Sequence, residues 1–242
     1  MKFYRRLMPF SAISFDLDDT LYSNYPIMMA TDQHMVAYFT QHLPANSQPY
    51  NYHYWFQFRQ QAIAEQPKLQ HDVGALRLYS YYLGIKALGK NDQQARALAK
   101  TAMQTFNYHR SNFSVPQTIH QLLSLLASRY PLVAISNGNV DTATIGISSY
   151  FRHIFHADLT QQQKPSVDMF KKACNALAIT PQQLLHVGDC GHSDIYGAIM
   201  AGCQSAWVST YTVGKPLTIL PNIELKHVEE LQRVITFSDN KI

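Results

Sequence analysis

Two short acidic segments are the part of the sequence best suited to chemistry. Residues 15–21 contain three aspartates within four positions, and residues 188–194 contain two more; they are Asp16, Asp18, Asp19, Asp189 and Asp194. Carboxylates this close together repel one another and raise each other's pKa values unless a cation lies between them. A folded protein tolerates such a group mainly where it binds a metal or carries out a reaction. The two segments therefore predict one magnesium-dependent site for phosphoryl transfer.

Three short apolar stretches predict the strands that position this site. They are residues 12–15, 132–135 and 184–187. Short apolar runs bounded by polar turns are typical of buried strands. Ligands of a parallel α/β sheet bind beyond the carboxyl ends of its strands. Because Asp16, Ser136 and Asp189 come at or just after the ends of these stretches, we expect them to face one crevice.

Strands and helices alternate through this part of the chain. Further strands are predicted at 153–156 and 203–209, and helices from Pro116 through Leu126, from Pro165 to about Ala178 with Ser166 as N-cap, at 180–183, at 193–201 and at 224–235. Such alternation is typical of a parallel sheet with helices on both faces. We predict an α/β fold with a doubly wound, mainly parallel sheet.

The region between the first acidic segment and residue 111 has a different character. Its hydrophobic residues follow helical spacing, and helices are predicted at about 26–42, 51–65, 72–88 and 92–108. Residues 111–116 have the composition of a linker. We therefore predict a catalytic core made of residues 1–21 and 112–242, with an all-helical insert at 22–111.

Four motifs in this order resemble the haloacid dehalogenase-like hydrolase superfamily. They are FDLDDTL at 15–21, ISNG around Ser136, QKP around Lys164, and GDCGHSD at 188–194. The resemblance covers residues 1–21 and about 112–210. It implies a Rossmann-like core, and it implies that the helical insert is a mobile cap over the active site.

The resemblance also implies a role for each matching residue. Asp16 would be the nucleophile, and Asp18 would act as general acid and then general base. Magnesium would be held by Asp16, the backbone carbonyl of Asp18 and Asp189, with Asp194 binding through water or orienting a neighbour. Phosphate oxygens would be held by Ser136, Asn137 and Lys164.

A narrower resemblance concerns the substrate. The opening residues 1–22, the HDV near His71, and the VAISNGN and LLHVGD stretches are similar to bacterial phosphatases that act on FMN and 5-amino-6-(5-phospho-D-ribitylamino)uracil. This implies a role in riboflavin metabolism. The insert is rich in aromatic residues, which fit the core of a small helical bundle, although one or two could stack on a flat ring of the substrate.

Other functions use similar residues. A phosphatase for other small sugar or nucleoside phosphates, a phosphomutase, and a phosphate- or metal-sensing module without turnover all remain open. A dehalogenase needs neither metal nor a second acid, so Asp18, Asp189 and Asp194 argue against it.

Several of the residues also have plain structural interpretations. Asp19 and Thr20 could cap the turn after the strand, Lys164 could be a surface lysine, and Asp194 could be the acidic first turn of a helix. His186 alternates with apolar residues and is predicted to be buried and hydrogen-bonded. Cys190 stands where relatives often carry a second aspartate.

Composition excludes some partners. The chain has 242 residues and a formal charge of +4 without a dense basic run, which does not indicate nucleic-acid binding. No apolar run approaches the length of a membrane span, and three cysteines without a close pair suit a reducing cytoplasm. We predict a cytoplasmic protein whose partner is a small phosphorylated molecule; the sequence does not indicate its oligomeric state.

Overall fold

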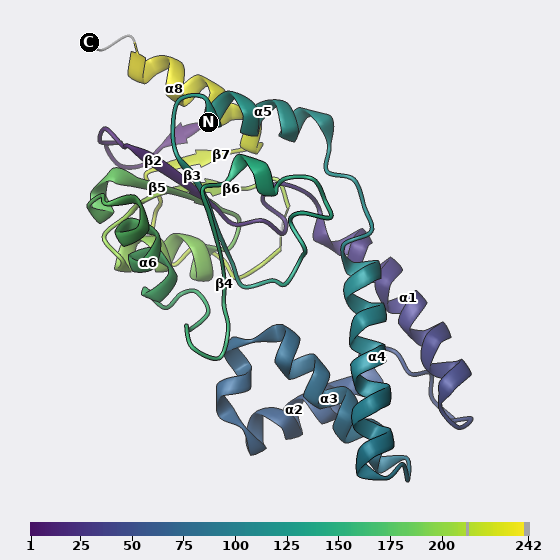
Figure 1. Cartoon of the computed structure of the whole chain (residues 1–242). Coiled ribbons are helices and arrows are strands. Elements are labelled where there is room, and N and C mark those ends of the chain that lie inside the picture. The colour runs from purple at the N-terminus through teal and green to yellow at the C-terminus, as the bar shows by residue number, and fades with distance from the viewer. Residues whose placement is uncertain (212, 240–242) are drawn as a thin grey trace. The chain divides into compact units, whose positions relative to one another are not determined.

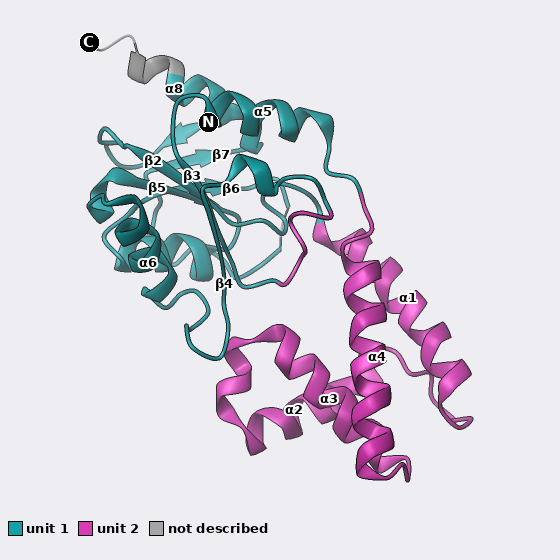
Figure 2. Ribbon diagram, viewed as in Figure 1, with its two compact units in different colours: residues 1–23, 114–138, 145–242 teal, residues 24–113, 139–144 magenta. Residues whose placement is uncertain are grey.

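The computed structural model describes residues 1–211 and 213–239, which form two compact units (Figure 2). The first unit consists of residues 1–23, 114–138 and 145–242, and the second of residues 24–113 and 139–144. The chain therefore leaves the first unit twice and returns twice. Among the described residues, no helix is both long and apolar enough to span a membrane.

The first unit is built on a seven-stranded sheet (Figure 1). Its strands are, in spatial order, β1 (Lys2–Phe3), β7 (Ile223–Leu225), β6 (Gln204–Val208), β5 (Leu184–Gly188), β2 (Ala12–Phe15), β3 (Leu132–Ser136) and β4 (His153–His156). All neighbours are parallel except β1 and β7. Strand β2 lies between β5 and β3, with Phe15 opposite Val187 and Ala134. The prediction of a mainly parallel α/β sheet is confirmed.

Helices cover both faces of this sheet, as expected for buried parallel strands. They are α5 (Gln117–Ala127), α6 (Asp168–Leu177), α7 (Gly197–Met200) and α8 (Leu231–Asp239), joined by short helices at Ser148–Tyr150, Pro181–Gln183, Gly191–Tyr196 and Val228–Glu230. Figure 1 shows α5 and α8 on one side of the sheet and α6 on the other. Helix α6 buries Met169 and Phe170 against Val133 and Ile135 of β3. This packing fixes the strand that ends at Ser136.

Two predictions about elements of this unit were wrong. Ser166 does not cap a helix, because α6 begins at Asp168 and its N-cap is Val167. The helix predicted at 224–235 begins only at Leu231, and the strand β7 occupies Ile223–Leu225. Both apolar residues of this three-residue strand are buried, but so short an alternation cannot be distinguished from helical spacing.

The second unit is helical. Its elements are α1 (Asn24–His42), α2 (Tyr52–Glu65), a short helix at Pro67–His71, α3 (Val73–Ala87) and α4 (Asp92–Arg110). Three of these helices begin at side chains that accept a backbone hydrogen bond, namely Asn51, Asp72 and Asn91. An aromatic core holds the helices together, including Phe39, Tyr50, Trp55, Tyr81 and Phe106. Most aromatic residues of the insert thus have the packing role that the sequence suggested.

Residues 139–144 also belong to the helical unit. The backbone N–H of Asp141 donates to Ser111 Oγ at 3.0 Å, and the Asn139 amide donates to Asn107 Oδ1 at 3.5 Å. This short segment follows directly after the Ser136 loop of the first unit, so a single loop serves both units.

Candidate active site

Strand β2 ends at the carboxyl edge of the sheet, and the first acidic segment follows there. All four of its residues are buried, and the Asp16 backbone N–H donates to Val187 O at 2.9 Å, which extends the pairing by one residue. The chain then turns sharply, with Asp19 in the left-handed region at φ 56° and its N–H bonded to Tyr22 O at 2.8 Å. The turn leaves Asp16 and Asp18 on the wall of one cavity.

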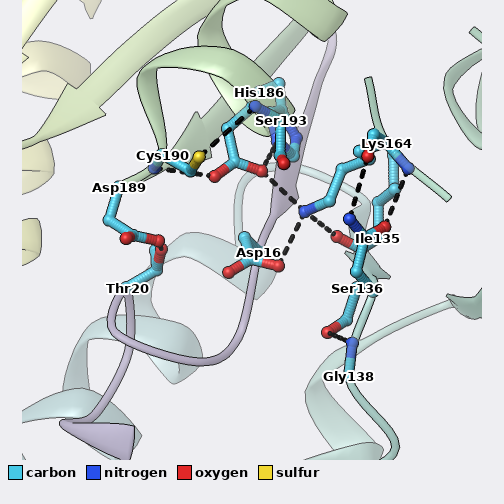
Figure 3. A network of polar contacts seen from close by, with 12 residues as sticks. Asp16, Thr20, Ile135, Ser136, Gly138, Lys164, His186, Asp189, Cys190 and Ser193 are labelled. Carbon is cyan, nitrogen blue, oxygen red and sulfur yellow. Dashed lines mark hydrogen bonds and ion pairs between the residues drawn. The ribbon is translucent and has the colours of Figure 1, made fainter. Parts of the chain in front are cut away.

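Lys164 lies at the centre of a buried polar network (Figure 3). Its Nζ donates three hydrogen bonds of 2.6 Å each, to Asp16 Oδ1, to Asp194 Oδ1 and to the carbonyl oxygen of Ile135. An ammonium group has three donors, so all of them are used within the protein. The other carboxylate oxygen of Asp16, Oδ2, accepts no hydrogen bond from the described residues. The network therefore orients Asp16 through one of its two carboxylate oxygens.

Asp194 is the most enclosed carboxylate of the group. Its Oδ1 also lies 3.2 Å from His186 Nε2, and its Oδ2 accepts the backbone N–H of Cys190 at 2.9 Å. His186 is fully buried on β5, with Nδ1 2.9 Å from Ser14 Oγ of β2. The predicted buried, hydrogen-bonded histidine is confirmed. It joins two strands to the carboxylate that pairs with Lys164.

Asp189 follows the end of β5 and faces the first acidic turn. Thr20 Oγ1 donates to Asp189 Oδ1 at 3.2 Å, and the Trp207 indole donates to the Asp189 carbonyl at 2.6 Å. One carboxylate oxygen from each of Asp16, Asp189 and Asp194 lies within 4.8 Å of the others. Hard oxygen donors in this arrangement suit Mg²⁺, which binds through few carboxylates and keeps several waters. The donor set fits the predicted metal.

The loop after β3 supplies neutral polar groups. Ser136 Oγ accepts the Gly138 N–H at 3.0 Å, which leaves the hydroxyl proton available to donate. The Asn137 amide pairs with the Lys164 backbone in both directions, at 2.8 and 3.0 Å. Asn137 thus ties this loop to the lysine segment. Its contact with phosphate stays a prediction, as does that of Ser136.

These side chains line a cavity of about 140 Å³. Its wall consists of Asp16, Asp18, Ser136, Asn137, Gly138, Lys164, Asp189, Cys190, Ser193 and Asp194. All seven residues that the sequence singled out for the site are therefore brought together. A polar cavity of this size, with one cation among several carboxylates, can hold a phosphate group together with a divalent ion.

Burial dominates the electrostatics of the site. Loss of solvent raises the pKa of Asp16 to about 7, opposed by Lys164 and reinforced by Asp194. Burial and then the charges of Asp16 and Asp194 raise the pKa of Asp189 to about 9. For Asp194, burial is outweighed by Lys164 and His186, so its pKa lies below the ordinary range. Lys164 therefore offsets the burial of Asp194, together with His186, and that of Asp16 in part, whereas no cation of the described residues pairs with Asp189.

Sequence reasoning missed several supporting residues. Neither Ser14 nor Trp207 belongs to a motif, and only pairing between distant strands reveals their contacts. Two glycines within the motifs mark places where a carboxylate lies against the backbone. A Cβ at Gly138 would lie 2.5 Å from Asp18 Oδ2, and one at Gly188 would lie 2.3 Å from Asp194 Cγ. Each glycine is required for a carboxylate to approach the backbone closely.

Comparisons with known proteins agree with this architecture. The family model of the haloacid dehalogenase-like hydrolases matches residues 10–202. The 5-amino-6-(5-phospho-D-ribitylamino)uracil phosphatase YigB of Escherichia coli K12 is 35% identical over 240 residues, covering 97% of this chain and 100% of that protein. A glyceraldehyde 3-phosphate phosphatase of Pyrococcus furiosus is 30% identical over 138 residues, which are 53% of this chain and 55% of that one. A solved 2-haloacid dehalogenase from Pseudomonas syringae covers 95% of this chain and 99% of its own with a TM-score of 0.85, at 24% identity.

The chain belongs to the haloacid dehalogenase-like hydrolase family, which the parallel sheet and its acidic cavity also indicate. Within this family it is a phosphatase, as its match to a phosphatase over nearly the full length of both chains establishes. The structural likeness to a dehalogenase, at 24% identity, concerns the fold.

Proposed function

We propose that the protein is a magnesium-dependent phosphomonoester hydrolase in which Asp16 is transiently phosphorylated. The observation that carries this proposal is the pairing of Lys164 Nζ with only one oxygen of Asp16, 2.6 Å away; Asp16 lines the cavity, and its Oδ2 accepts no hydrogen bond from the described residues. A carboxylate held on one side and open on the other is suited to nucleophilic attack.

The reaction has two displacements at phosphorus. In the first, Asp16 Oδ2 attacks the phosphorus, the bond to the ester oxygen breaks, and Asp18 gives its proton to the departing alcohol. In the second, Asp18 takes a proton from water, the water oxygen attacks the phosphorus, and the bond to Asp16 breaks. Inorganic phosphate is released and both aspartates return to their starting states.

The remaining residues hold charge and position. Mg²⁺, held by Asp16, the carbonyl of Asp18 and Asp189, would neutralise the crowded carboxylates and the phosphoryl oxygens. Asp194 pairs with Lys164 and would either bind the metal through water or orient that neighbour. Ser136, Asn137 and Lys164 would bind phosphoryl oxygens as charge develops on them. Since all three Lys164 donors are engaged within the protein, binding of phosphate by its ammonium requires one of these bonds to be exchanged.

Replacement of Asp16 by Asn tests the nucleophile. The amide keeps the size of the side chain but cannot form the phosphoryl ester, so we expect phosphate release from any substrate to fall by at least about 10³-fold. Circular dichroism should show an unchanged fold. The matched control is Asp168→Asn, an exposed aspartate at the start of α6, which should keep wild-type turnover. A variant Asp16→Asn with most of its activity would refute the assignment.

For the substrate, we propose 5-amino-6-(5-phospho-D-ribitylamino)uracil or FMN, which places the enzyme in riboflavin metabolism in the cytoplasm. Support comes from the relative in Escherichia coli, whose similarity extends through the helical unit as well as the core. We also propose that residues 22–111 act as a cap that selects the leaving group, over a core formed by 1–21 and 112–242. A phosphatase for small sugar phosphates is the second candidate, because the Pyrococcus relative acts on glyceraldehyde 3-phosphate.

A panel of phosphate esters distinguishes these candidates. Phosphate release should require Mg²⁺, be abolished by a chelator, and have its highest kcat/KM with the two flavin-pathway compounds. Equal rates with generic sugar phosphates would remove the riboflavin assignment while leaving the reaction class intact. An isomerised phosphate ester without free phosphate would instead identify a phosphomutase, and halide release from 2-haloacids a dehalogenase. Binding without turnover would identify a sensing module.

A further inference from the structure

A second small pocket lies within the helical unit, and none of the residues proposed for the phosphatase reaction lines it. Helices α2 and α3 form it, and they run close together in Figure 1. Two arginines, Arg59 and Arg77, share its wall with the aromatic side chains of Tyr52, Trp55, Phe56 and Tyr81. The cavity measures about 20 Å³. It therefore admits a group about the size of one water, with the rest of any ligand lying at its mouth.

Arg77 is held firmly in this wall. Its guanidinium carbon lies 3.8 Å from the centre of the Phe106 ring, a cation–π contact. Its Nε is buried and has no hydrogen-bond partner in the part of the chain that the structure describes. The nearby acid is Asp32 of α1, whose pKa is raised by burial and lowered by the Tyr52 backbone N–H and the charges of Arg77 and His53. Arg77 thus has one countercharge but an unused donor.

Arg59 lacks even that compensation. It is half-buried, and no carboxylate among the residues that the structure describes lies within 4.0 Å of it. Burial and the charge of Arg77 both lower its pKa, and only the Tyr52 hydroxyl acts in the opposite sense. Two guanidinium groups line the pocket, and the one carboxylate near them, that of Asp32, interacts with Arg77, which leaves a positive charge in a partly desolvated place. Such an arrangement is costly without an anion.

We propose that this pocket binds a small oxyanion, a phosphate or a carboxylate, between Arg59 and Arg77. A guanidinium presents a rigid fork of donors that matches the oxygens of both groups. One oxygen fits the 20 Å³ cavity, and the remainder of the anion lies at the opening, beside the exposed rings of Tyr52 and Phe56. The pocket is a ligand site in its own right. It does not depend on the proposed phosphatase reaction.

Tryptophan fluorescence provides a local readout, because the chain has two tryptophans and Trp55 lines the pocket. In the full-length variant Trp207→Phe, Trp55 is the single reporter, and no turnover is needed. Inorganic phosphate, or acetate as the carboxylate probe, should change its emission in a saturable way at constant ionic strength. Adding Arg59→Gln should weaken the apparent affinity by about tenfold or more, since hydrogen bonds to charged groups are lost.

Two further variants, made in the same Trp207→Phe background, make the outcome decisive. Arg96→Gln removes an exposed arginine of the same helical unit, one that pairs with Asp92, and should leave the affinity unchanged. Arg59→Lys keeps the charge but not the fork, so its affinity should lie between those of the parent and Arg59→Gln. Unchanged circular dichroism verifies that each variant is folded. A response that does not saturate with either probe, or one that Arg96→Gln weakens as much as Arg59→Gln does, would overturn the proposal.

Discussion

At the scale of single residues, Lys164 has the largest influence on the site. Its ammonium is almost inaccessible to solvent and joins two carboxylates that come from different ends of the chain, Asp16 and Asp194. Its backbone is fixed by Asn137, and Asp194 is fixed in turn by His186 and a backbone N–H. The lysine thus serves as a built-in cation that keeps the acidic cluster folded.

Removal of this cation should be costly. The change Lys164→Met leaves the buried carboxylates of Asp16 and Asp194 without their ammonium partner, and breaking such a pair typically costs about 3–5 kcal/mol. We expect a loss of this size in the free energy of unfolding, measured by urea denaturation without divalent metal, together with loss of phosphatase activity. The control Lys172→Met removes an exposed lysine that bonds to Gln161, and it should change stability by less than about 0.5 kcal/mol. A Lys164→Met protein as stable as the wild type would show that the network does not support the fold.

The sequence predicted which residues would meet but not how they would bond. Asp16, Asp189 and Lys164 could be assigned to one site because each belongs to a motif at the end of a strand or beside one. The second bond of Lys164, to Asp194, could not be predicted, because it depends on the exact depth of a side chain. His186 illustrates the same limit: alternation with apolar residues indicated burial, and only strand pairing revealed Ser14 as its partner.

At the scale of elements, close packing of α2 against α3 depends on a glycine. A Cβ at Gly84 would lie 2.5 Å from the Trp55 ring and 2.9 Å from Phe58. The change Gly84→Ala should therefore cost about 1–3 kcal/mol from overpacking, offset by about 1 kcal/mol from better helix propensity. We expect a net decrease of up to about 2 kcal/mol in the stability of the helical unit. Thermal denaturation of the variant and the wild type measures this decrease.

A double-mutant cycle with Trp55→Leu can establish the cause of this loss. The smaller side chain makes room for the methyl group that Gly84→Ala introduces. The loss of stability in the double variant should therefore be smaller than the sum of the losses in the two single variants, by about 0.5–3 kcal/mol. Additive effects would mean that the methyl group does not meet the indole.

Element prediction succeeded where patterns were long and failed where they were short. The four long helices of the insert and the central strands of the sheet were predicted close to their observed bounds. Strands β1 and β7 were not predicted. They contain two and three residues respectively, which is too short for a periodic pattern to be recognised. Their pairing with each other joins the first residues of the chain to residues 223 and 224, which no local pattern encodes.

At the scale of the whole molecule, the acidic cluster should link stability to pH and metal. A carboxyl whose pKa is higher in the folded than in the unfolded chain binds protons more tightly when folded. Its contribution to stability is therefore largest at low pH and is lost as pH rises through the raised value. Burial raises the pKa of Asp16 to about 7 and that of Asp189 to about 9, whereas unfolded aspartates titrate near 4.

We therefore expect the metal-free protein to lose stability as the pH rises from about 4 to about 9, by at most about 1.4 kcal/mol per pH unit for each proton involved, with Asp16 contributing up to about pH 7 and Asp189 up to about pH 9. Thermal unfolding in a chelator at several pH values measures this slope. Saturating Mg²⁺, which binds the ionised carboxylates, should flatten or reverse it and should release protons on binding. The variant Asp189→Asn should show a smaller slope than the wild type in chelator. A slope that is equal with and without Mg²⁺ would contradict the link between this cluster and metal.

The position of β2 within the sheet has a consequence for synthesis on the ribosome. This strand emerges early, yet its two neighbours are β3 and β5, at residues 132–136 and 184–188. Residues 24–113 of the helical unit, by contrast, form one continuous segment of the nascent chain. The helices can thus assemble while the strand that precedes Asp16 still has both backbone edges exposed. Until residues 132–136 and 184–188 have been synthesised, β2 has neither of its partner strands, so its apolar residues stay exposed while the helices fold.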